Sequence, residues 1–244
     1  MHLETVLIQM RTMRLSAMAE SLQRHLATGT HQELSHEEFV ALLVQEEHDE
    51  RKNRKLTRMI NRANFKPEQA TLDNISFADS RGLKRVDVAQ FRSDTWIQNC
   101  QNVIITGPTG AGKTFLAEAI ALQACKLGFP AVKKRFRILF EEIHEAKGVG
   151  VYLKYLKKIE KMKVLIIDDF VMNDISVDDL NDLMDVIELR EQVAPVIVTT
   201  QYPIDKWHLK LPDPTIADAI CDRLLKGAII FKLKGDSMRK STFK

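Results

Sequence analysis

The segment 107–114, with the sequence GPTGAGKT, has the residue types and spacing that point most directly to chemistry. It follows the apolar residues Val103, Ile104 and Ile105, and a helical pattern follows it. Such a strand–loop–helix arrangement is typical of a phosphate-binding loop. Glycines suit the loop because several backbone N–H groups must converge on one anion, and side chains would block the approach. The next helix adds the positive end of its dipole, so we expect nucleotide phosphates here.

Two side chains of this loop have specific expected roles. Lys113 is expected to reach the β- and γ-phosphates of ATP, and the Thr114 hydroxyl is expected to ligate Mg²⁺. The remaining nucleotide contacts are expected from Gly107, Pro108, Thr109, Gly110, Ala111, Gly112 and Phe115. The alternative is a glycine-rich turn with a coincidental lysine, which the flanking strand and helix patterns disfavour.

A pair of acids, Asp168 and Asp169, ends the segment KVLIIDD at 163–169. The apolar run predicts a buried parallel strand with carboxylates at its C-terminal end. Open α/β sheets bind ligands at the carboxyl ends of their strands, so Asp168 is expected beside the phosphate loop as a Mg²⁺ ligand. Asp169 is expected to polarise the attacking water. Taken alone, the pair would favour the alternative, two solvated acids that cap a strand; the phosphate loop upstream favours the metal site.

Composition predicts a soluble globular protein: of 244 residues, 45% are hydrophobic and 28% are charged. We expect one α/β domain of about 170 residues plus a smaller domain. No signal peptide or membrane span is evident, so the expected location is the cytoplasm, with no membrane partner. Three cysteines without a CxxC pair are typical of reduced thiols, and the histidines lack metal-ligand spacing.

The segment 51–66 contains seven basic residues and no acid. At helical spacing, five of them form one stripe: Arg51, Lys55, Arg58, Arg62 and Lys66. Such a stripe can neutralise the phosphates of DNA. A solvated basic face balanced by the acidic stretch 37–50 is the alternative.

Hydrophobic periodicity predicts three parts. Residues 1–66 are expected to form a helical N-terminal domain that binds DNA or a partner, with a capping box at Ser35 and Glu38. Residues 67–100 are expected to be a linker, and residues 101–244 a nucleotide-binding domain. In that domain, strands are expected at 103–106, 131–136, 163–167, 196–198 and 229–231, alternating with helices at 113–127, 137–161, 176–191 and 215–226. Such alternation predicts an α/β fold: a parallel sheet with helices on both faces.

Three further motifs complete a pattern: TTQYP at 199–203, CDRLL at 221–225 and GDSMR at 235–239. Together with the phosphate loop and the acidic strand, over nearly the whole chain, they resemble the IstB-like ATPases, transposition helper proteins encoded by bacterial insertion sequences. These proteins are relatives of the DnaC-type helicase loaders in the initiator branch of the AAA+ superfamily. The resemblance implies a P-loop AAA+ sheet preceded by a small all-helical domain.

The resemblance also implies roles for three residues. Gln201, or Thr200 before it, corresponds to the polar sensor that positions water. Arg223 corresponds to the arginine finger that reaches the γ-phosphate of a neighbouring subunit, and Arg239 to the sensor arginine. The chain departs from the family at Thr200-Gln201, where Ser-Asn is usual. It departs again at Met238, where Tyr is common, and at Val171, where Gly follows Phe170.

The implied function is that of an ATP-dependent, DNA-binding oligomer that assists a transposase. ATP and Mg²⁺ are the implied cofactors. Double-stranded DNA, the cognate transposase and further copies of the chain, with ATP sites at subunit interfaces, are the implied partners. Lys133, Lys134 and Arg135 are further candidates for DNA contacts. Two alternatives stay open: a replicative helicase loader, and a DNA-binding module that uses ATP as a switch with negligible turnover.

Overall fold

The computed structural model describes residues 2–65, 70–78, 81–235 and 237, and the chain divides into two compact units, Met1–Arg58 and Met59–Lys244. The N-terminal elements are all helical, as the sequence predicts: α1 (Leu3–Thr12), α2 (Ser16–Thr28), the 3₁₀ helix η1 (Thr30–Glu33) and α3 (His36–Ala63). Ser35 and Glu38 form the predicted capping box, in which the Ser35 N–H donates to Glu38 Oε2 at 2.8 Å and the Glu38 N–H to Ser35 Oγ at 3.3 Å.

One five-stranded parallel sheet organises the second unit, with strand order β2-β3-β4-β1-β5. Its strands are β1 (Val103–Thr106), β2 (Ala131–Arg135), β3 (Val164–Asp168), β4 (Val196–Thr200) and β5 (Ile229–Lys232). The α/β fold class predicted from the alternating pattern is confirmed. Strands β1, β3 and β4 are buried along their whole lengths, which explains their continuous apolar runs.

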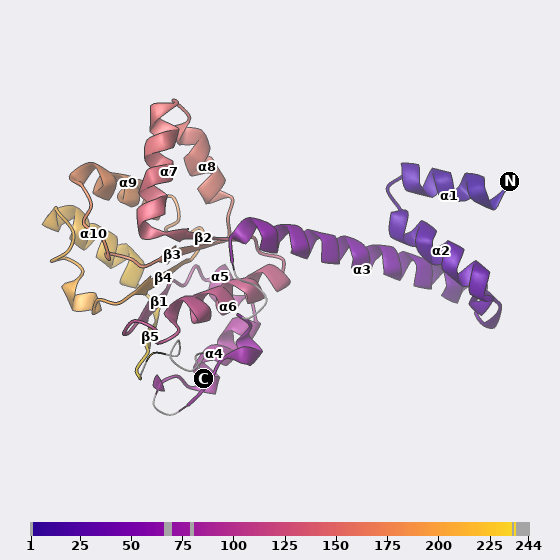
Figure 1. Cartoon of the computed structure of the whole chain (residues 1–244), viewed down its shortest axis with the longest axis horizontal. Coiled ribbons are helices and arrows are strands. Elements are labelled where there is room, and N and C mark those ends of the chain that lie inside the picture. The colour runs from indigo at the N-terminus through magenta and orange to yellow at the C-terminus, as the bar shows by residue number, and fades with distance from the viewer. Residues whose placement is uncertain (1, 66–69, 79–80, 236, 238–244) are drawn as a thin grey trace. The chain divides into compact units, whose positions relative to one another are not determined.

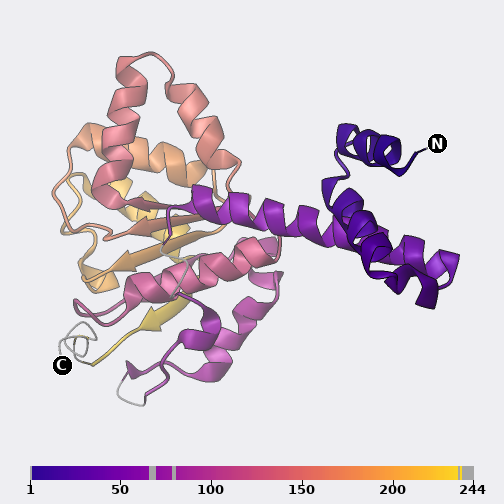
Figure 2. The same cartoon turned by 45° about the vertical axis from the view of Figure 1, so that its right-hand side comes forward.

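Helices cover both faces of the sheet (Figures 1 and 2). The helix α6 (Lys113–Lys126) contacts β1, β2, β3 and β4 on one face. On the other face lie α7 (Phe136–Gly148), α9 (Val177–Glu188) and α10 (Pro214–Leu225), which share a core with Ile104 and Leu165. Successive residues of a strand point to opposite faces, so each strand contributes to both cores.

The helical region predicted over 137–161 is two helices, α7 and α8 (Tyr152–Glu160). Gly150 adopts a φ of 71° between them, a left-handed conformation that ends α7. The N–H groups of Gly150 and Val151 donate to the carbonyls of Lys147 and Ala146 at 3.0 and 2.7 Å. A glycine in this conformation is a common helix stop, so the break has a local cause.

The segment expected to be a linker is part of the second unit wherever the structure describes it. It contains η2 (Leu72–Asn74), α4 (Arg85–Ala89), η4 (Gln90–Arg92) and α5 (Thr95–Gln98). Phe91 and Trp96 are buried, their ring centroids lie 5.3 Å apart, and Phe91 also packs against Phe231 of β5 at 6.0 Å. These aromatic contacts attach the segment to the edge of the sheet.

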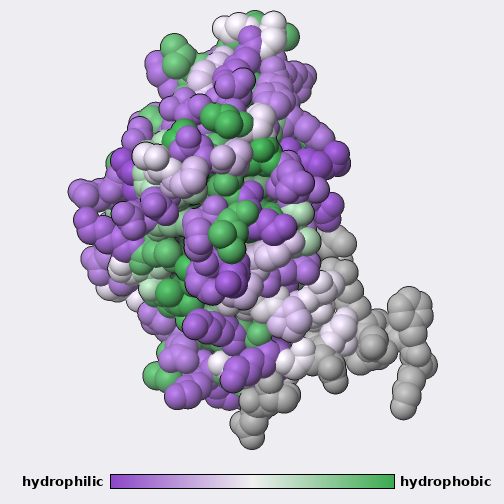
Figure 3. Space-filling model, turned by 90° about the vertical axis from the view of Figure 1, so that its left-hand side faces the viewer, coloured by the Kyte–Doolittle hydropathy of each residue, from purple (hydrophilic) through white to green (hydrophobic). Residues whose placement is uncertain are grey.

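The surface near α9 and α10 is mainly hydrophilic, with hydrophobic residues scattered over it (Figure 3). Such scattering is normal for a folded domain in water. Among the described residues, no helix combines the length and the apolar character that a membrane span requires.

Candidate nucleotide site

Three neighbouring strands deliver the predicted site residues to one edge of the sheet. β4 lies between β3 and β1, and all three are parallel. The phosphate loop follows β1, Asp168 ends β3, and Gln201 follows β4. Thr106 of β1 pairs in register with Thr200 of β4, so the segments after these strands begin at the same level. The carboxyl edge of the sheet therefore gathers residues as far apart in the chain as Gly107 and Gln201.

Two glycines of the loop lie against the segment that follows β5. A Cβ atom on Gly107 would come within 2.5 Å of the Leu233 carbonyl oxygen, and one on Gly110 would overlap Ser237 Oγ. Both glycines also have left-handed φ values, 148° and 82°. The segment after β5 therefore leaves no room for a side chain at these two positions, and the approach of phosphates excludes one as well.

Lys113 lies across the inside of the loop at the first position of α6. The residue is buried, and its Nζ donates to the carbonyl oxygens of Gly107 and Pro108, both at 2.9 Å. These contacts hold the ammonium group where the N-terminus of α6 also directs its positive dipole end. Both features favour a bound anion at this point.

The two predicted metal ligands are in direct contact. Thr114 Oγ1 donates to Asp168 Oδ1 at 2.9 Å, and Thr199 Oγ1 donates to the same carboxylate oxygen at 2.5 Å. Asp168 is 3% exposed, so it is held by these hydroxyls rather than by solvent. A carboxylate beside a hydroxyl at a phosphate loop is the hard-oxygen donor set that suits Mg²⁺. The residues present therefore fit the implied ion.

Thr199 is a site residue that sequence reasoning missed. It is fully buried, and its Oγ1 also accepts from the Asp169 N–H at 3.2 Å. One hydroxyl thus contacts both members of the acidic pair. The sequence offered a signal, because Thr199 is the first residue of the TTQYP motif. Which of the two consecutive threonines turns toward the acids depends on the sheet.

The acidic pair is followed by a strained turn. Asp169 and Val171 adopt left-handed φ values of 59° and 53°, which are uncommon for residues other than glycine. Between them Phe170 is fully buried against Phe136 and Trp207, with ring centroids 5.0 and 4.7 Å away. The family that the sequence resembles has Gly at the position of Val171. The β-branched side chain of Val171 adds to the strain in the turn that presents Asp169.

The structure separates the two candidates for the polar sensor. Gln201 lies beside the phosphate loop, where its Oε1 accepts from Thr109 Oγ1 at 2.7 Å. Thr200 is buried, and its hydroxyl donates to the Phe170 carbonyl at 3.0 Å and accepts from the Tyr202 N–H at 3.1 Å. Gln201 is therefore the residue of this pair whose side chain can face a nucleotide.

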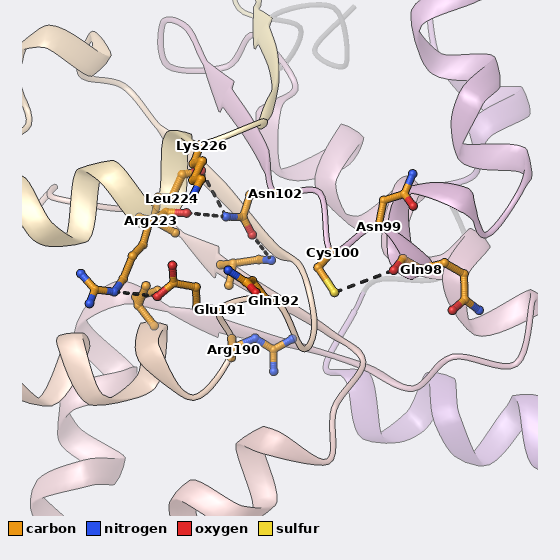
Figure 4. Close-up of a pocket in the computed structure, with 12 residues that line it drawn as sticks. Gln98, Asn99, Cys100, Asn102, Arg190, Glu191, Gln192, Arg223, Leu224 and Lys226 are labelled. Carbon is orange, nitrogen blue, oxygen red and sulfur yellow. Dashed lines mark hydrogen bonds and ion pairs between the residues drawn. The ribbon is translucent and has the colours of Figure 1, made fainter.

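Arg223 lies in the last turn of α10, beside a cavity of about 310 Å³ (Figure 4). Its Nε donates to Glu191 Oε2 at 2.9 Å, and its Nη2 donates to Glu188 Oε1 at 3.0 Å. The Arg223 side chain keeps about a quarter of its surface exposed. It is therefore oriented by two carboxylates and is still accessible from outside.

Asn102 places this turn of α10 at the amino edge of the sheet. Its Nδ2 donates to the carbonyls of Arg223 and Leu224 at 3.0 and 3.2 Å, and its Oδ1 accepts from the Val196 N–H at 2.8 Å (Figure 4). Asn102 immediately precedes β1, whereas the phosphate loop follows β1. A strand of this length separates the two by about 13 Å. Arg223 therefore lies on the opposite edge of the sheet from the phosphate loop of its own chain.

A second residue that sequence reasoning missed is Arg81. It is buried, and its Nη2 donates to the Ala111 carbonyl of the phosphate loop at 2.8 Å. A single arginine before the first strand has no distinguishing pattern, so nothing in the sequence could have singled it out. Arg239 and Lys66, by contrast, lie outside the described residues.

The basic stripe lies on α3, and its members differ in their surroundings. Lys55, Arg58 and Arg62 are exposed, and within the described part of the chain no ion pair engages them. Arg51 donates through Nε to Glu47 Oε1 at 2.7 Å and through Nη2 to the Arg14 carbonyl at 2.8 Å. Three of the four candidates therefore carry a charge that no ion pair among the described residues engages.

Two of the further candidates for DNA contacts are engaged inside the fold. Lys133 forms an ion pair with Glu118 in which both side chains are largely buried, and Lys134 forms one with Glu142 at 2.6 Å. These partners were not visible in the sequence, because β2 brings the lysines beside helices α6 and α7. Both lysines already have a carboxylate partner within the fold, and their contact with DNA stays a prediction.

Comparisons with known proteins agree with this geometry. The sequence profile of the family described as "IstB-like ATP binding protein" matches residues 8–244. A Sinorhizobium fredii protein named as an insertion sequence ATP-binding protein, y4pL, is 32% identical over 96% of this chain and 95% of its own length. The insertion sequence IS21 ATP-binding protein of Pseudomonas aeruginosa is 28% identical over 97% and 88%.

Solved structures agree on the fold. The DnaC helicase loader covers 68% of this chain and 98% of its own, at 18% identity with a TM-score of 0.56. AMPPCP-bound DnaA from Aquifex aeolicus covers 73% of this chain and 54% of its own, at 16% identity with a TM-score of 0.59. The second unit therefore has the AAA+ P-loop fold.

Proposed function

The chain belongs to the IstB-like ATP-binding protein family, and from this premise we propose that it hydrolyses ATP, assembles on DNA and assists a transposase. The contact of Thr114 with Asp168 beside Lys113 is the observation that supports this most. It places a carboxylate that can ligate Mg²⁺ beside a phosphate-binding loop, and phosphoryl transfer requires both groups. The names of the relatives, which refer to insertion sequences, support the transposase as partner.

Each residue of the site then has a task. Lys113 and the loop N–H groups bind the phosphates, and Thr114 with Asp168 would hold Mg²⁺. Bound Mg²⁺ would neutralise charge that develops on the transferred phosphoryl group. Asp169 and Gln201 lie at the ends of adjacent strands, where they can orient a water molecule toward the γ-phosphate.

We propose that Arg223 acts on the nucleotide of a neighbouring copy. Its position at the opposite edge of the sheet separates it from the loop of its own chain. A guanidinium that is accessible and already oriented by carboxylates suits an interface between subunits. The active form would therefore be a homo-oligomer with ATP between adjacent copies.

Replacing Asp169 with Asn is expected to leave ATP affinity within about threefold and to lower turnover at least about 100-fold, because general-base assistance contributes about 10²–10⁴. Phosphate release in the presence of duplex DNA measures turnover. Asp174→Asn, an exposed acid in the same loop, is the matched control and should behave like the parent. Equal turnover in the Asp169 variant and the parent would contradict the assignment.

We assign residues 1–66 to DNA and partner binding and residues 101–244 to ATP binding, and we place the protein in the bacterial cytoplasm. The charges of Lys55, Arg58 and Arg62, with Arg51 nearby on α3, support a contact to the DNA backbone. Such contacts read no sequence, so DNA binding should be nearly independent of sequence.

Salt dependence tests this interface. If Lys55, Arg58 and Arg62 each neutralise one phosphate, replacing all three with Ala should reduce the slope of log K against log salt by about 2.7 in magnitude. Arg54→Ala is the control, because Glu50 already pairs with that charge. An unchanged slope in the triple variant would leave a solvated basic face as the correct description. DNA binding measured by fluorescence anisotropy across a salt series gives the slope.

The nearest alternative partner is a replicative helicase. The DnaC helicase loader shares the fold, but an identity of 18% shows no more than that. A pairwise binding assay with ATP decides between the two. The tagged protein is incubated separately with the transposase and with the replicative helicase of the same cell, and the protein that it retains is the partner.

A further inference from the structure

A buried arginine joins the phosphate loop to the segment before β1. Arg81 is 8% exposed. Its Nη2 donates to the Ala111 carbonyl at 2.8 Å, and its Nη1 donates to the Ser76 carbonyl at 2.7 Å. Because the guanidinium is rigid and planar, these two bonds set its position relative to the loop.

The backbone around Arg81 is held on two sides. Its N–H donates to the Ala78 carbonyl at 2.9 Å, and its carbonyl accepts from the Lys234 N–H at 3.0 Å, beyond the end of β5. Gly82 follows with a left-handed φ of 66° and passes close to the Lys232 carbonyl. The side chain of Arg81 therefore extends from a fixed point on the sheet edge into the loop.

The bond to Ala111 orients one peptide of the loop. The structure contains no cis peptide among the described residues, and in a trans peptide the C=O and N–H bonds point in opposite directions. Because the Ala111 carbonyl faces Arg81, the Gly112 N–H faces away from it. No acceptor among the described residues takes that N–H, and Gly112 is the N-cap of α6. N–H groups at this position of a phosphate loop are the ones that bind phosphates.

Among the described residues, no carboxylate provides a counter-charge for Arg81. The ion pairs found among the described residues do not include Arg81, and its Nε has no hydrogen-bond partner there. Burial accordingly lowers the pKa of its guanidinium. A buried cation without a carboxylate is costly, and an anion bound nearby reduces that cost. The phosphates of a nucleotide on the adjacent loop are such an anion.

We propose that Arg81 is a positioning residue of the nucleotide site, which directs the Gly112 N–H toward the bound phosphates and places positive charge behind the loop. The inference rests on the proposed nucleotide site at Lys113 and adds to it a residue from outside the recognised motifs. It predicts equal effects on ATP and ADP, because the loop N–H groups bind the α- and β-phosphates that both nucleotides share.

The test compares Arg81→Met and Arg81→Lys with the parent in fluorescent-nucleotide titrations and in thermal unfolding with and without ATP. The Met variant is expected to bind ATP and ADP at least tenfold more weakly. The Lys variant, which keeps the charge but not the two-point geometry, should fall between the Met variant and the parent. The rise in Tm that ATP produces should shrink in the same order. If the Met variant does not fold, the Lys variant decides.

Arg190 is the matched control. It is also a buried arginine bonded to carbonyls: Nη1 donates to Ile159 and Met162 at 3.1 and 3.0 Å, and Nη2 to Pro195 at 2.9 Å. These contacts lie at the amino edge of the sheet, away from the loop. Arg190→Lys should lower Tm and leave nucleotide affinity within twofold of the parent.

Two results would overturn the role of Arg81 while the proposed function stands. In the first, the parent binds ATP and a folded Arg81→Lys or Arg81→Met variant binds it with an affinity within twofold of the parent's. The other is an Arg190→Lys variant that loses as much affinity as Arg81→Lys, since general loosening of the fold would then explain both. A parent that binds no nucleotide would instead overturn the proposed function together with this inference.

Discussion

Replacing Arg223 with Ala is expected to lower ATP turnover by about 10³–10⁵-fold, the usual contribution of an arginine that stabilises the γ-phosphate in the transition state. The ATP affinity of the separate subunit should be unchanged, because Arg223 lies at the opposite edge of the sheet from its own phosphate loop. Stability should change by less than about 1 kcal/mol, since its pairs with Glu188 and Glu191 are partly exposed. Arg92→Ala, which removes an exposed arginine paired with Asp73, is the control.

Mixing experiments show whether Arg223 acts in trans. Arg223→Ala subunits keep an intact loop, and Lys113→Ala subunits keep the arginine, so a mixed oligomer contains some complete sites. Turnover should therefore reappear when the two inactive variants are combined. Mixtures that stay inactive while both variants join the oligomer would show that Arg223 has a role within its own chain, such as holding α10 to α9.

Replacing Lys113 with Ala is expected to weaken ATP binding at least about 100-fold, since hydrogen bonds to charged groups contribute about 1.5–3 kcal/mol each and the ammonium can make two or more with the phosphates. The folded chain should persist, because Lys113 Nζ donates to the Gly107 and Pro108 carbonyls, which belong to the phosphate loop itself.

Fluorescent-nucleotide titration measures this loss, and circular dichroism checks the fold. Lys126→Ala, at the other end of α6, is the control because it removes the same charge from the same helix. An affinity for ATP equal to that of the parent in the Lys113 variant would mean that the loop does not bind the nucleotide through this lysine. Neither DNA nor oligomer formation is needed for the measurement.

Local features of the sequence were sufficient for the fold class and for the phosphate loop. The loop is eight contiguous residues whose glycines and lysine have one well-known use, so no distant contact is needed to recognise it. The strands β1, β3 and β4 are continuous apolar runs because both their faces are buried, and such runs stand out between polar segments. The break between α7 and α8 was missed, although Gly150 is a local stop, because the apolar pattern continues on both sides.

The sequence by itself was sufficient to predict the chemistry of the site, since Lys113, Thr114 and Asp168 belong to motifs with regular spacing. The tertiary structure alone decided which other side chains join them. Thr199 reaches Asp168 because β4 lies beside β3. Arg81 reaches the Ala111 carbonyl because the fold brings together residues that are 30 positions apart in the chain. The tertiary structure also decided that Lys133 is paired with Glu118 and that Arg223 lies away from the phosphate loop of its own chain. Hydroxyls, arginines and lysines donate hydrogen bonds to any nearby carbonyl or carboxylate. Their partners therefore depend on strand order and packing, and a local sequence pattern predicts neither.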